Sequence, residues 1–116
     1  MGDQEQKTLA QRTGRIRELN DRLRQRHEGR VVITRGIASL PVATVARVLF
    51  AVRDFAAFDA RNDPHGEGDM GRVEVDGHEC WFRIDYFSAD LESGSPDPAD
   101  ENITTRVMTI LLAEEL

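Results

Sequence analysis

The densest group of side chains that could do chemistry lies in the ten residues 62–71. Four ionisable residues alternate there with small ones, and these are Asp63, His65, Glu67 and Asp69. A folded loop could point several of them at one place, and carboxylate and imidazole groups are ligands for divalent metals. The spacing also resembles a calcium loop, because Asp63, Gly68 and Glu74 occupy its first, sixth and twelfth positions.

Two features of the same segment argue against a metal site. His65 stands where a calcium loop has an oxygen ligand, and the residues after Gly71 alternate like a strand rather than continuing as a helix. We therefore expect a turn whose carboxylates accept backbone hydrogen bonds, with no metal or other cofactor. Metal-dependent hydrolysis by the four ionisable residues is the alternative.

Nucleophilic catalysis has little support in the sequence. Cys80 falls on the predicted buried face of a hairpin, where a cysteine acts as a small apolar side chain. No motif links His27, His65 and His78, and the chain lacks the Gly-x-Ser-x-Gly, phosphate-loop and dinucleotide-binding patterns. We expect a protein that binds rather than an enzyme.

A row of alternating residues, Trp81, Arg83 and Asp85, projects from the other face of the same hairpin. The predicted pairing also sets Glu74 opposite Glu79, which is unfavourable unless something offsets it. One interpretation is that the N-terminal helix covers this face and neutralises the glutamates with its arginines (Arg15, Arg22 and Arg24). The other is that the face binds a partner.

Charge is distributed unevenly along the chain. Residues 1–58 carry 11 basic and 6 acidic groups, whereas residues 59–116 carry 4 and 15. Acidic surfaces repel DNA and suit partners with basic surfaces, including proteins and ribonucleoproteins that handle nucleic acids. The predicted partner-binding residues combine this acidic half with the hairpin row: Asp63, Glu67, Asp69, Trp81, Arg83, Asp85, Asp90, Glu92, Asp97 and Asp100.

The N-terminal segment offers a different binding mode. Six arginines between residues 12 and 26 could contact nucleic acid, but Glu18 and Asp21 interrupt them and no aromatic residue is present for base stacking. A DNA-binding regulator is thus an alternative, and direct DNA binding is not our expectation. The narrow apolar stripe of Leu9, Ile16 and Leu23 could also form a homodimer seam.

The elements that position these residues follow from local patterns. Residues 1–28 are predicted to contain an amphipathic helix, and residues 30–36 are β-branched and read as a strand. A second helix begins at Pro41, with its apolar face at i, i+3, i+4 and i+7 spacing: Val45, Val48, Leu49, Val52, Phe55 and Ala56. Residues 59–71 are rich in turn formers and predict a loop.

Residues 72–86 have the pattern of a β-hairpin. Asp76-Gly77 separates two alternating runs, which is a strong signal for a two-residue turn. With these as turn residues, Val75 pairs with His78 and Val73 with Cys80. One face then holds only side chains suited to a core: Val73, Val75, Cys80, Phe82 and Ile84.

A final helix is predicted after the irregular segment 91–100. Asp100 or Asn102 could cap it, and its buried stripe would be Ile103, Val107, Ile110 and Leu111. The order α-β-α-β-β-α predicts one α+β domain over residues 1–116, in which residues 29–116 form a small antiparallel sheet with two helices and the first 28 residues add a third.

Other properties of the whole sequence bear on location. The chain has 116 residues, a net charge of −6 and a single cysteine, and it starts with polar residues rather than with a secretion signal. No apolar run approaches the roughly 20 residues of a membrane-spanning helix. We expect a cytoplasmic protein that does not cross a membrane.

Several segments resemble a family of small uncharacterised proteins, a domain of unknown function found mostly on plasmids, integrated elements and phages of alphaproteobacteria. They are NDPHGEGDMG, WFRIDYFSADLESGSPDPAD, TTRVMTILLAEEL, RIRELNDRLR and RVVITRGIASLP. His65 stands where the family tends to have Tyr, Gly68 where it has His, and Met70 where it has Phe. The missing second His weakens a metal site further.

This resemblance implies that the gene belongs to mobile genetic elements, and it implies no particular chemistry. Mobile-element genes of this size often encode antagonists of host defence, such as anti-CRISPR or anti-restriction proteins. With the acidic half and the missing catalytic motifs, this leads us to expect an accessory protein that inhibits a host-defence or nucleic-acid-handling complex. The sequence does not separate the anti-CRISPR role from the anti-restriction role or name the partner.

Overall fold

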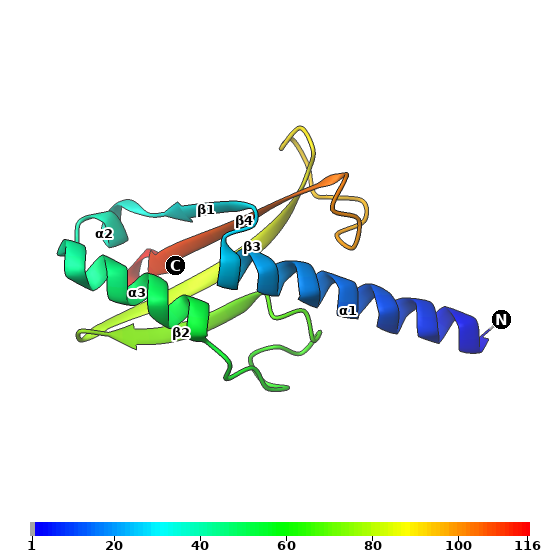
Figure 1. Cartoon of the computed structure of the whole chain (residues 1–116), viewed down its shortest axis with the longest axis horizontal. Helices are drawn as coiled ribbons and strands as arrows, with labels where there is room; N and C mark the ends of the chain where they lie inside the picture. Colours follow the sequence, from blue (N-terminus) through cyan, green and yellow to red (C-terminus); the bar gives the residue numbers. More distant parts are fainter. Residues whose placement is uncertain (1) are drawn as a thin grey trace.

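A computed structural model describes the backbone of residues 2–116 and the side chains of residues 8–116. It has α+β architecture, as predicted, with three α-helices and a four-stranded sheet (Figure 1). The elements in chain order are α1 (Gly2–Arg26), β1 (Arg30–Ile33), α2 (Arg35–Ala38), α3 (Val42–Asp54), β2 (Met70–Val75), β3 (His78–Ser88), β4 (Thr104–Leu112) and the 3-10 turn η1 (Ala113–Glu115). In this part of the chain, no helix is both long enough and apolar enough to cross a membrane.

The sheet is mixed, which corrects the prediction of an antiparallel one. Its strand order is β1-β4-β3-β2. The pairs β2–β3 and β3–β4 are antiparallel, but β1 runs parallel to β4, with Val32 opposite Thr109. The first strand and the last strand of the chain therefore lie side by side, and β1 and β2 are the edges.

The hairpin prediction is confirmed to the residue. Val75 pairs with His78 and Val73 with Cys80, so Asp76 and Gly77 form the two-residue turn. Both have positive φ, 51° and 81°, as a type I′ turn requires. The predicted core face is correct as well, since Phe82 and Cys80 are fully buried.

The predicted C-terminal helix is wrong. Residues 104–112 form β4, the strand between β1 and β3, and Asp100 caps a turn before it rather than a helix. Burial along β4 alternates, with Met108 and Ile110 in the core and Val107 half-buried on the opposite face. Ile103, which the helical stripe included, is exposed and lies outside the strand.

Two other boundaries differ from the prediction. β1 ends at Ile33, because Thr34 accepts a hydrogen bond from the Ile37 N–H and starts the short helix α2. Pro41 lies just before α3, whose buried residues include Val48 and Val52. Ala56, which the predicted stripe contained, lies beyond the helix and is exposed.

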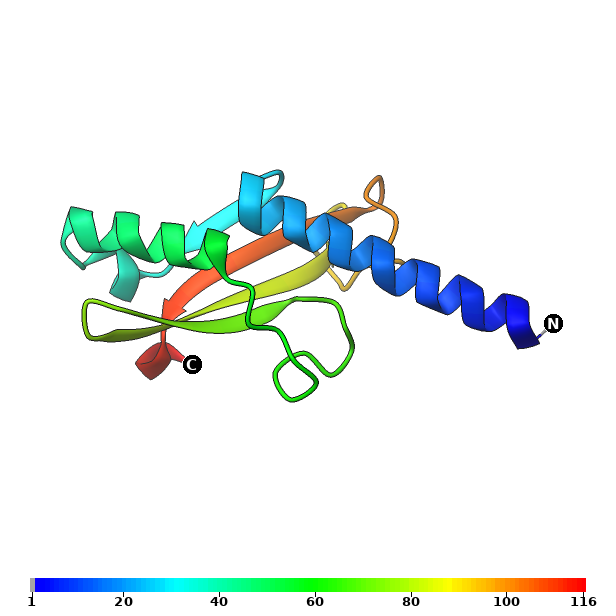
Figure 2. The ribbon, with the colours of Figure 1, turned by 60° about the horizontal axis from the view of Figure 1, so that its bottom comes forward.

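Helices α1 and α3 cover the same face of the sheet (Figure 2). Between them and the strands lies the hydrophobic core, to which α1 contributes Leu23 and α3 contributes Val48. Three aromatic rings pack edge to face there, with centroid distances of 4.7 Å between Phe55 and Phe58 and 5.3 Å between Phe55 and Phe82.

The interpretation that the N-terminal helix covers Trp81 and neutralises the hairpin glutamates is therefore wrong. α1 packs on the opposite face, through Ile16, Leu19 and Leu23. Arg72 offsets the Glu74–Glu79 pair instead, since its guanidinium forms ion pairs with both carboxylates. The sheet face that bears Trp81 is covered by neither α1 nor α3.

Candidate functional site

The loop before β2, residues 55–69, is stabilised by its own side chains. The Asp59 carboxylate accepts hydrogen bonds from the N–H groups of Arg61 and Asn62. The Asn62 side chain accepts from the Asp59 N–H and donates to the carbonyl of Ala57. Such side-chain bonds to nearby backbone are typical of Asn and Asp in turns.

Asp63 is buried in this loop and has structural partners. Its Oδ1 accepts from the Gly68 N–H at 3.0 Å, and its Oδ2 lies 3.4 Å from Nη1 of Arg17. Gly68 has φ +62°, and a Cβ there would lie 2.7 Å from the Arg17 side chain. The positive φ favours glycine at position 68, and a larger residue there would also displace the Arg17 side chain.

Glu67 belongs to a polar network between the loop, α1 and the sheet. Tyr86 donates to Glu67 Oε1 at 2.7 Å, and Asn20 Nδ2 donates both to the Tyr86 hydroxyl, at 2.7 Å, and to the Glu67 carbonyl. Arg106 Nε donates to Asn20 Oδ1 at 3.0 Å. Burial and the hydrogen bond to Glu67 raise the pKa of Tyr86 above its ordinary value, so it remains a proton donor.

The four ionisable residues that a metal-dependent hydrolase would use are not brought together as ligands. Asp63 and Glu67 have the partners described above, and His65 is exposed. Partial burial raises the pKa of the Asp69 carboxyl, aided by the charges of Glu67 and Asp63. Among the described residues, no three His, Cys, Asp or Glu side chains are grouped so that they could hold a metal ion.

Cys80 lies in the core, as predicted. Its side chain is fully buried, and desolvation raises the pKa of its thiol above the ordinary value. The arrangement therefore keeps the sulfur protonated and away from solvent, which is the environment of a packing residue.

The predicted binding row lies on the uncovered face of the sheet. Trp81, Arg83, Asp85 and Phe87 follow one another there along β3, and Arg83 forms an ion pair with Asp85 at 3.1 Å. The neighbouring strand adds Val107, opposite Asp85. The aromatic and Val107 side chains are half-buried, although no long helix covers them.

The acidic residues that follow β3 form a second group. The connection from β3 to β4, residues 89–103, carries five carboxylates and no basic residue. Asp90 accepts hydrogen bonds from the Ser88 hydroxyl and the Glu92 N–H, which hold the pKa of its carboxyl below the ordinary value. Asp90 and Glu92 are exposed at the end of the row on β3.

Two acidic residues of this connection are paired with α1. Arg12 lies 2.9 Å from Asp97 and lowers the pKa of that carboxyl, and Arg15 lies 3.0 Å from Glu101. The structure thus separates the ten predicted partner-binding residues into three places. Asp63, Glu67 and Asp69 are in the loop beside α1, Trp81, Arg83 and Asp85 are on the open sheet face, and Asp90, Glu92, Asp97 and Asp100 are in the connection to β4.

The arginines of α1 that favoured DNA binding have carboxylate partners. Arg17 bonds to Asp21 as well as to Asp63, and Arg22 lies 2.8 Å from Glu18. Arg24 is buried and donates to three backbone carbonyls. These arginines form ion pairs and hydrogen bonds within the fold, so a ligand would have to displace those partners.

Sequence reasoning missed some residues that matter for these sites. Asn20 and Arg106 are buried polar side chains that no local pattern distinguishes from exposed ones. Val42 and Phe50 are exposed apolar residues of α3 that lie outside its predicted stripe. Their positions were a usable signal, because a contiguous group of apolar residues on the solvent side of a helix often marks an interface.

The chain is similar to a known protein family. No curated protein and no solved structure is significantly similar to this chain. A family model described as a protein of unknown function, DUF3768, matches residues 33–115. This segment includes the hairpin, the loop with Asp63 and Glu67, and all of β4. Since the match covers well over half of its length, the chain belongs to the DUF3768 family.

Proposed function

We propose that this protein is a binding protein of mobile genetic elements that inhibits a host-defence or nucleic-acid-handling complex in the cytoplasm, in the manner of anti-CRISPR or anti-restriction proteins. One observation carries the proposal. The sheet face with the partly exposed Trp81 and Phe87 is covered by neither α1 nor α3 and adjoins an exposed acidic connection that contains Asp90 and Glu92.

The open face has the composition of a protein interface. Aromatic and aliphatic side chains lie beside the Arg83–Asp85 ion pair and the ion pairs of Arg72 with Glu74 and Glu79. Tryptophan is enriched among residues that dominate binding energies. A sheet with helices on only one face leaves a flat surface of this kind for a partner.

Charge favours a partner with a basic surface. The connection from β3 to β4 has five carboxylates, of which Asp97 and Glu101 pair with α1. Asp90, Glu92 and Asp100 have no ion pair among the described side chains, so their field extends into solvent. Such a field accelerates encounter with a basic surface and discriminates against DNA.

Membership in DUF3768 is compatible with this proposal but names no activity. The mobile-element setting rests on the sequence resemblance alone. Hydrolysis by the loop before β2 and DNA binding by α1 are weaker candidates, because the side chains they need already have structural partners.

The test is protection of a phage from host defence. The protein is expressed in alphaproteobacterial cells that carry either a CRISPR system or a restriction system against the infecting phage, and the efficiency of plating is measured. We expect it to rise at least tenfold with one of the systems. No rise with any system of either kind would contradict the proposed function.

Variants test whether the proposed surface is responsible. Trp81→Ala and the pair Asp90→Asn/Glu92→Gln are expected to lose the protection. The matched control Glu28→Gln/Glu114→Gln removes the same amount of charge from exposed sites elsewhere, and this variant should keep the protection. Circular dichroism must show that each variant is folded. Full protection by both surface variants would contradict the assignment of the surface.

A further inference from the structure

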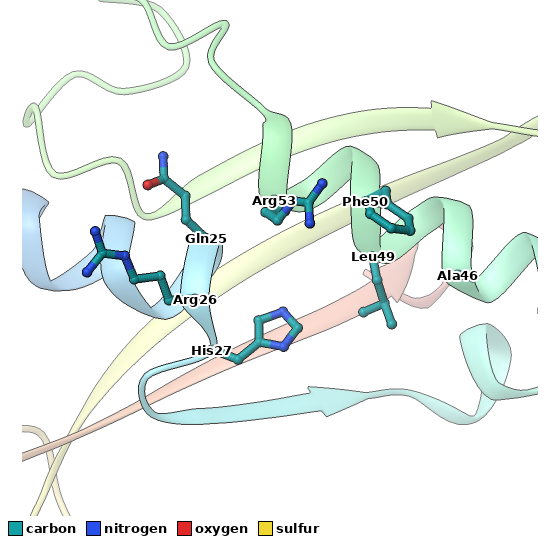
Figure 3. A pocket seen from close by; sticks show the side chains of 7 residues that line it. All are labelled: Gln25, Arg26, His27, Ala46, Leu49, Phe50 and Arg53. Atoms are coloured by element: carbon teal, nitrogen blue, oxygen red, sulfur yellow. The ribbon is translucent and has the colours of Figure 1, made fainter.

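An apolar groove separates α3 from β1 and from the end of α1. It has two adjoining parts, with volumes of about 340 Å³ and about 380 Å³, and both are lined by Ala46 and Leu49 of α3. In Figure 3, Leu49 and His27 both point into the first part, with Phe50 and Arg53 on the helix above. Ile33 of β1 lines the second part.

The rim of this groove exposes more apolar surface than a solvated helix needs. Val42 is 88% exposed, Phe50 is 56% exposed and Ile33 is 38% exposed. A contiguous exposed patch of this kind on a small protein usually marks a place where another molecule binds.

The backbone beside the groove is also open. β1 pairs only with β4, and no other strand of residues 2–116 adjoins it. The Thr34 N–H bonds to the Ile110 carbonyl, and the backbone groups of consecutive residues point to opposite edges of a strand. The N–H and C=O groups of Val31 and Ile33 therefore point to the free edge, where an added strand would bond.

Basic residues surround this edge. Arg26 and Arg53 line one end of the groove, Arg30 begins β1, and Arg35 follows its other end. Arg26 and Arg53 form ion pairs with Glu28 and Asp54, whereas no carboxylate among the described side chains forms an ion pair with Arg30 or Arg35. Their charge is therefore available to a ligand.

This charge decides between the two natural occupants of an open edge. A second copy that paired antiparallel through β1, with Val32 opposite Val32, would bring Arg30 of each chain close to Arg35 of the other, and like charges repel. We propose that the occupant is an extended acidic peptide segment of another protein, which adds to β1 as a fifth strand.

The geometry specifies the ligand further. Residues of the added strand that align with Val31 and Ile33 face the helices, so two apolar side chains, two positions apart, enter the groove beside Leu49. Asp or Glu residues flanking them lie within reach of Arg30 and Arg35. The groove lies on the helix side of the sheet and would attract ligands of the opposite charge to the acidic connection, although Arg30, aligned with Val107, points to the same side of the sheet as Trp81.

The experiment is a selection of random nine-residue peptides displayed on phage against the full chain. The enriched peptides should alternate apolar residues and carry Asp or Glu on both sides of them. Absence of enrichment, or enrichment of basic peptides, would overturn the proposal. The affinity of the best peptide is then measured by fluorescence anisotropy.

One variant tests the free backbone edge of β1, and a second tests the basic charge beside it. Val31→Pro removes an outward N–H without removing a bond to β4, and Arg30→Glu/Arg35→Glu reverses the charge. Each should weaken the peptide at least tenfold, whereas Arg61→Glu, an exposed arginine of the loop before β2, should not. Thermal unfolding checks that each variant is folded. Unchanged affinity in both variants would overturn the site.

Sedimentation of the protein without peptide tests the other occupant. We expect a sedimentation coefficient that does not depend on concentration. A dimer in the wild type that Val31→Pro abolishes would assign the edge to a second copy and overturn the peptide proposal.

Discussion

Asp76 has a local role and a tertiary role. Locally it occupies a positive-φ position of the hairpin turn, which Asp and Asn tolerate better than most residues. In the tertiary structure its carboxylate accepts hydrogen bonds from Thr44, at 2.8 Å, and from Arg47, at 2.9 Å. These bonds attach the hairpin to α3 and hold the pKa of the Asp76 carboxyl below its ordinary value.

The lowered pKa predicts a direction for the pH dependence of stability. At pH values between the folded-state pKa and the unfolded-state pKa of about 4, the unfolded chain binds more protons than the folded one. The interaction therefore stabilises the fold fully above pH 4, and this stabilisation is lost as the pH falls through the lower, folded-state pKa. Asp76→Asn should therefore lower the urea midpoint at pH 7 and have a smaller effect at pH 2.5.

Asparagine retains the turn conformation, so the comparison isolates the charge. Glu114→Gln, at an exposed site in η1, should leave the urea midpoint at pH 7 unchanged. An Asp76→Asn effect that is equal at both pH values would show that the charge of Asp76 does not contribute to stability.

At the scale of elements, Arg24 joins α1 to α3. Its side chain is 2% exposed, and Nη1 donates to the carbonyls of Val52, Arg53 and Phe55 at the end of α3. The guanidinium shares the Val52 carbonyl with the Phe55 N–H, and it satisfies the carbonyls of Arg53 and Phe55, which lie past the last helical hydrogen bonds. Nη2 reaches Asp21 at 3.1 Å, which fixes the side chain on its own helix.

We predict that Arg24→Leu lowers the free energy of unfolding by about 2–4 kcal/mol, because it leaves buried carbonyls without donors. Arg24→Lys should recover only part of this, since an ammonium lacks the planar fork of donors. Urea unfolding followed by circular dichroism measures both. The exposed Arg26→Leu is the control, expected within about 0.5 kcal/mol of the wild type. Equal stability of the Arg24→Leu and Arg26→Leu variants would refute the role.

β4 shows why an apolar pattern alone misassigns an element. Val107, Ile110 and Leu111 fit a helical spacing, but Met108, Ile110 and Leu112 fit a strand equally well. The segment also contains the β-branched residues Thr104, Thr105, Val107, Thr109 and Ile110, which favour strands. Pairing with a strand on each side decides the matter in favour of β4.

At the scale of the whole molecule, α1 is held to the body by both charge and apolar packing. The basic first half and the acidic second half meet in the pairs Arg12–Asp97 and Arg15–Glu101. The apolar stripe considered for a dimer seam is used within the chain, since Ile16 and Leu23 are buried, although Leu9 remains 58% exposed.

We predict that Leu23→Ala lowers the free energy of unfolding by about 3 kcal/mol, the usual cost of a buried cavity of this size. Leu9→Ala should change it by less than about 0.5 kcal/mol. Because the packing is intramolecular, the unfolding midpoint should not depend on protein concentration. A wild-type midpoint that rises with concentration would instead favour a homodimer.

The sequence by itself determined the elements whose signals are local. The first long helix, the helix after Pro41 and the Asp76-Gly77 hairpin with its register follow from periodicity and turn residues that lie within a few positions of each other. The buried site of Cys80 followed from that register. The carboxylates of the loop before β2 were likewise expected to bond to backbone, as Asp63 does to Gly68.

Only the tertiary structure decided which elements meet. The parallel pairing of β1 with β4 joins residues 30–33 to residues 107–110, and no local pattern encodes a contact across such a separation. The same holds for the Asn20–Tyr86–Glu67 network, for Arg24 at the end of α3 and for the groove between α3 and β1. Burial of a polar side chain depends on partners that the fold brings from elsewhere in the chain, because only a satisfied polar group can leave water at low cost.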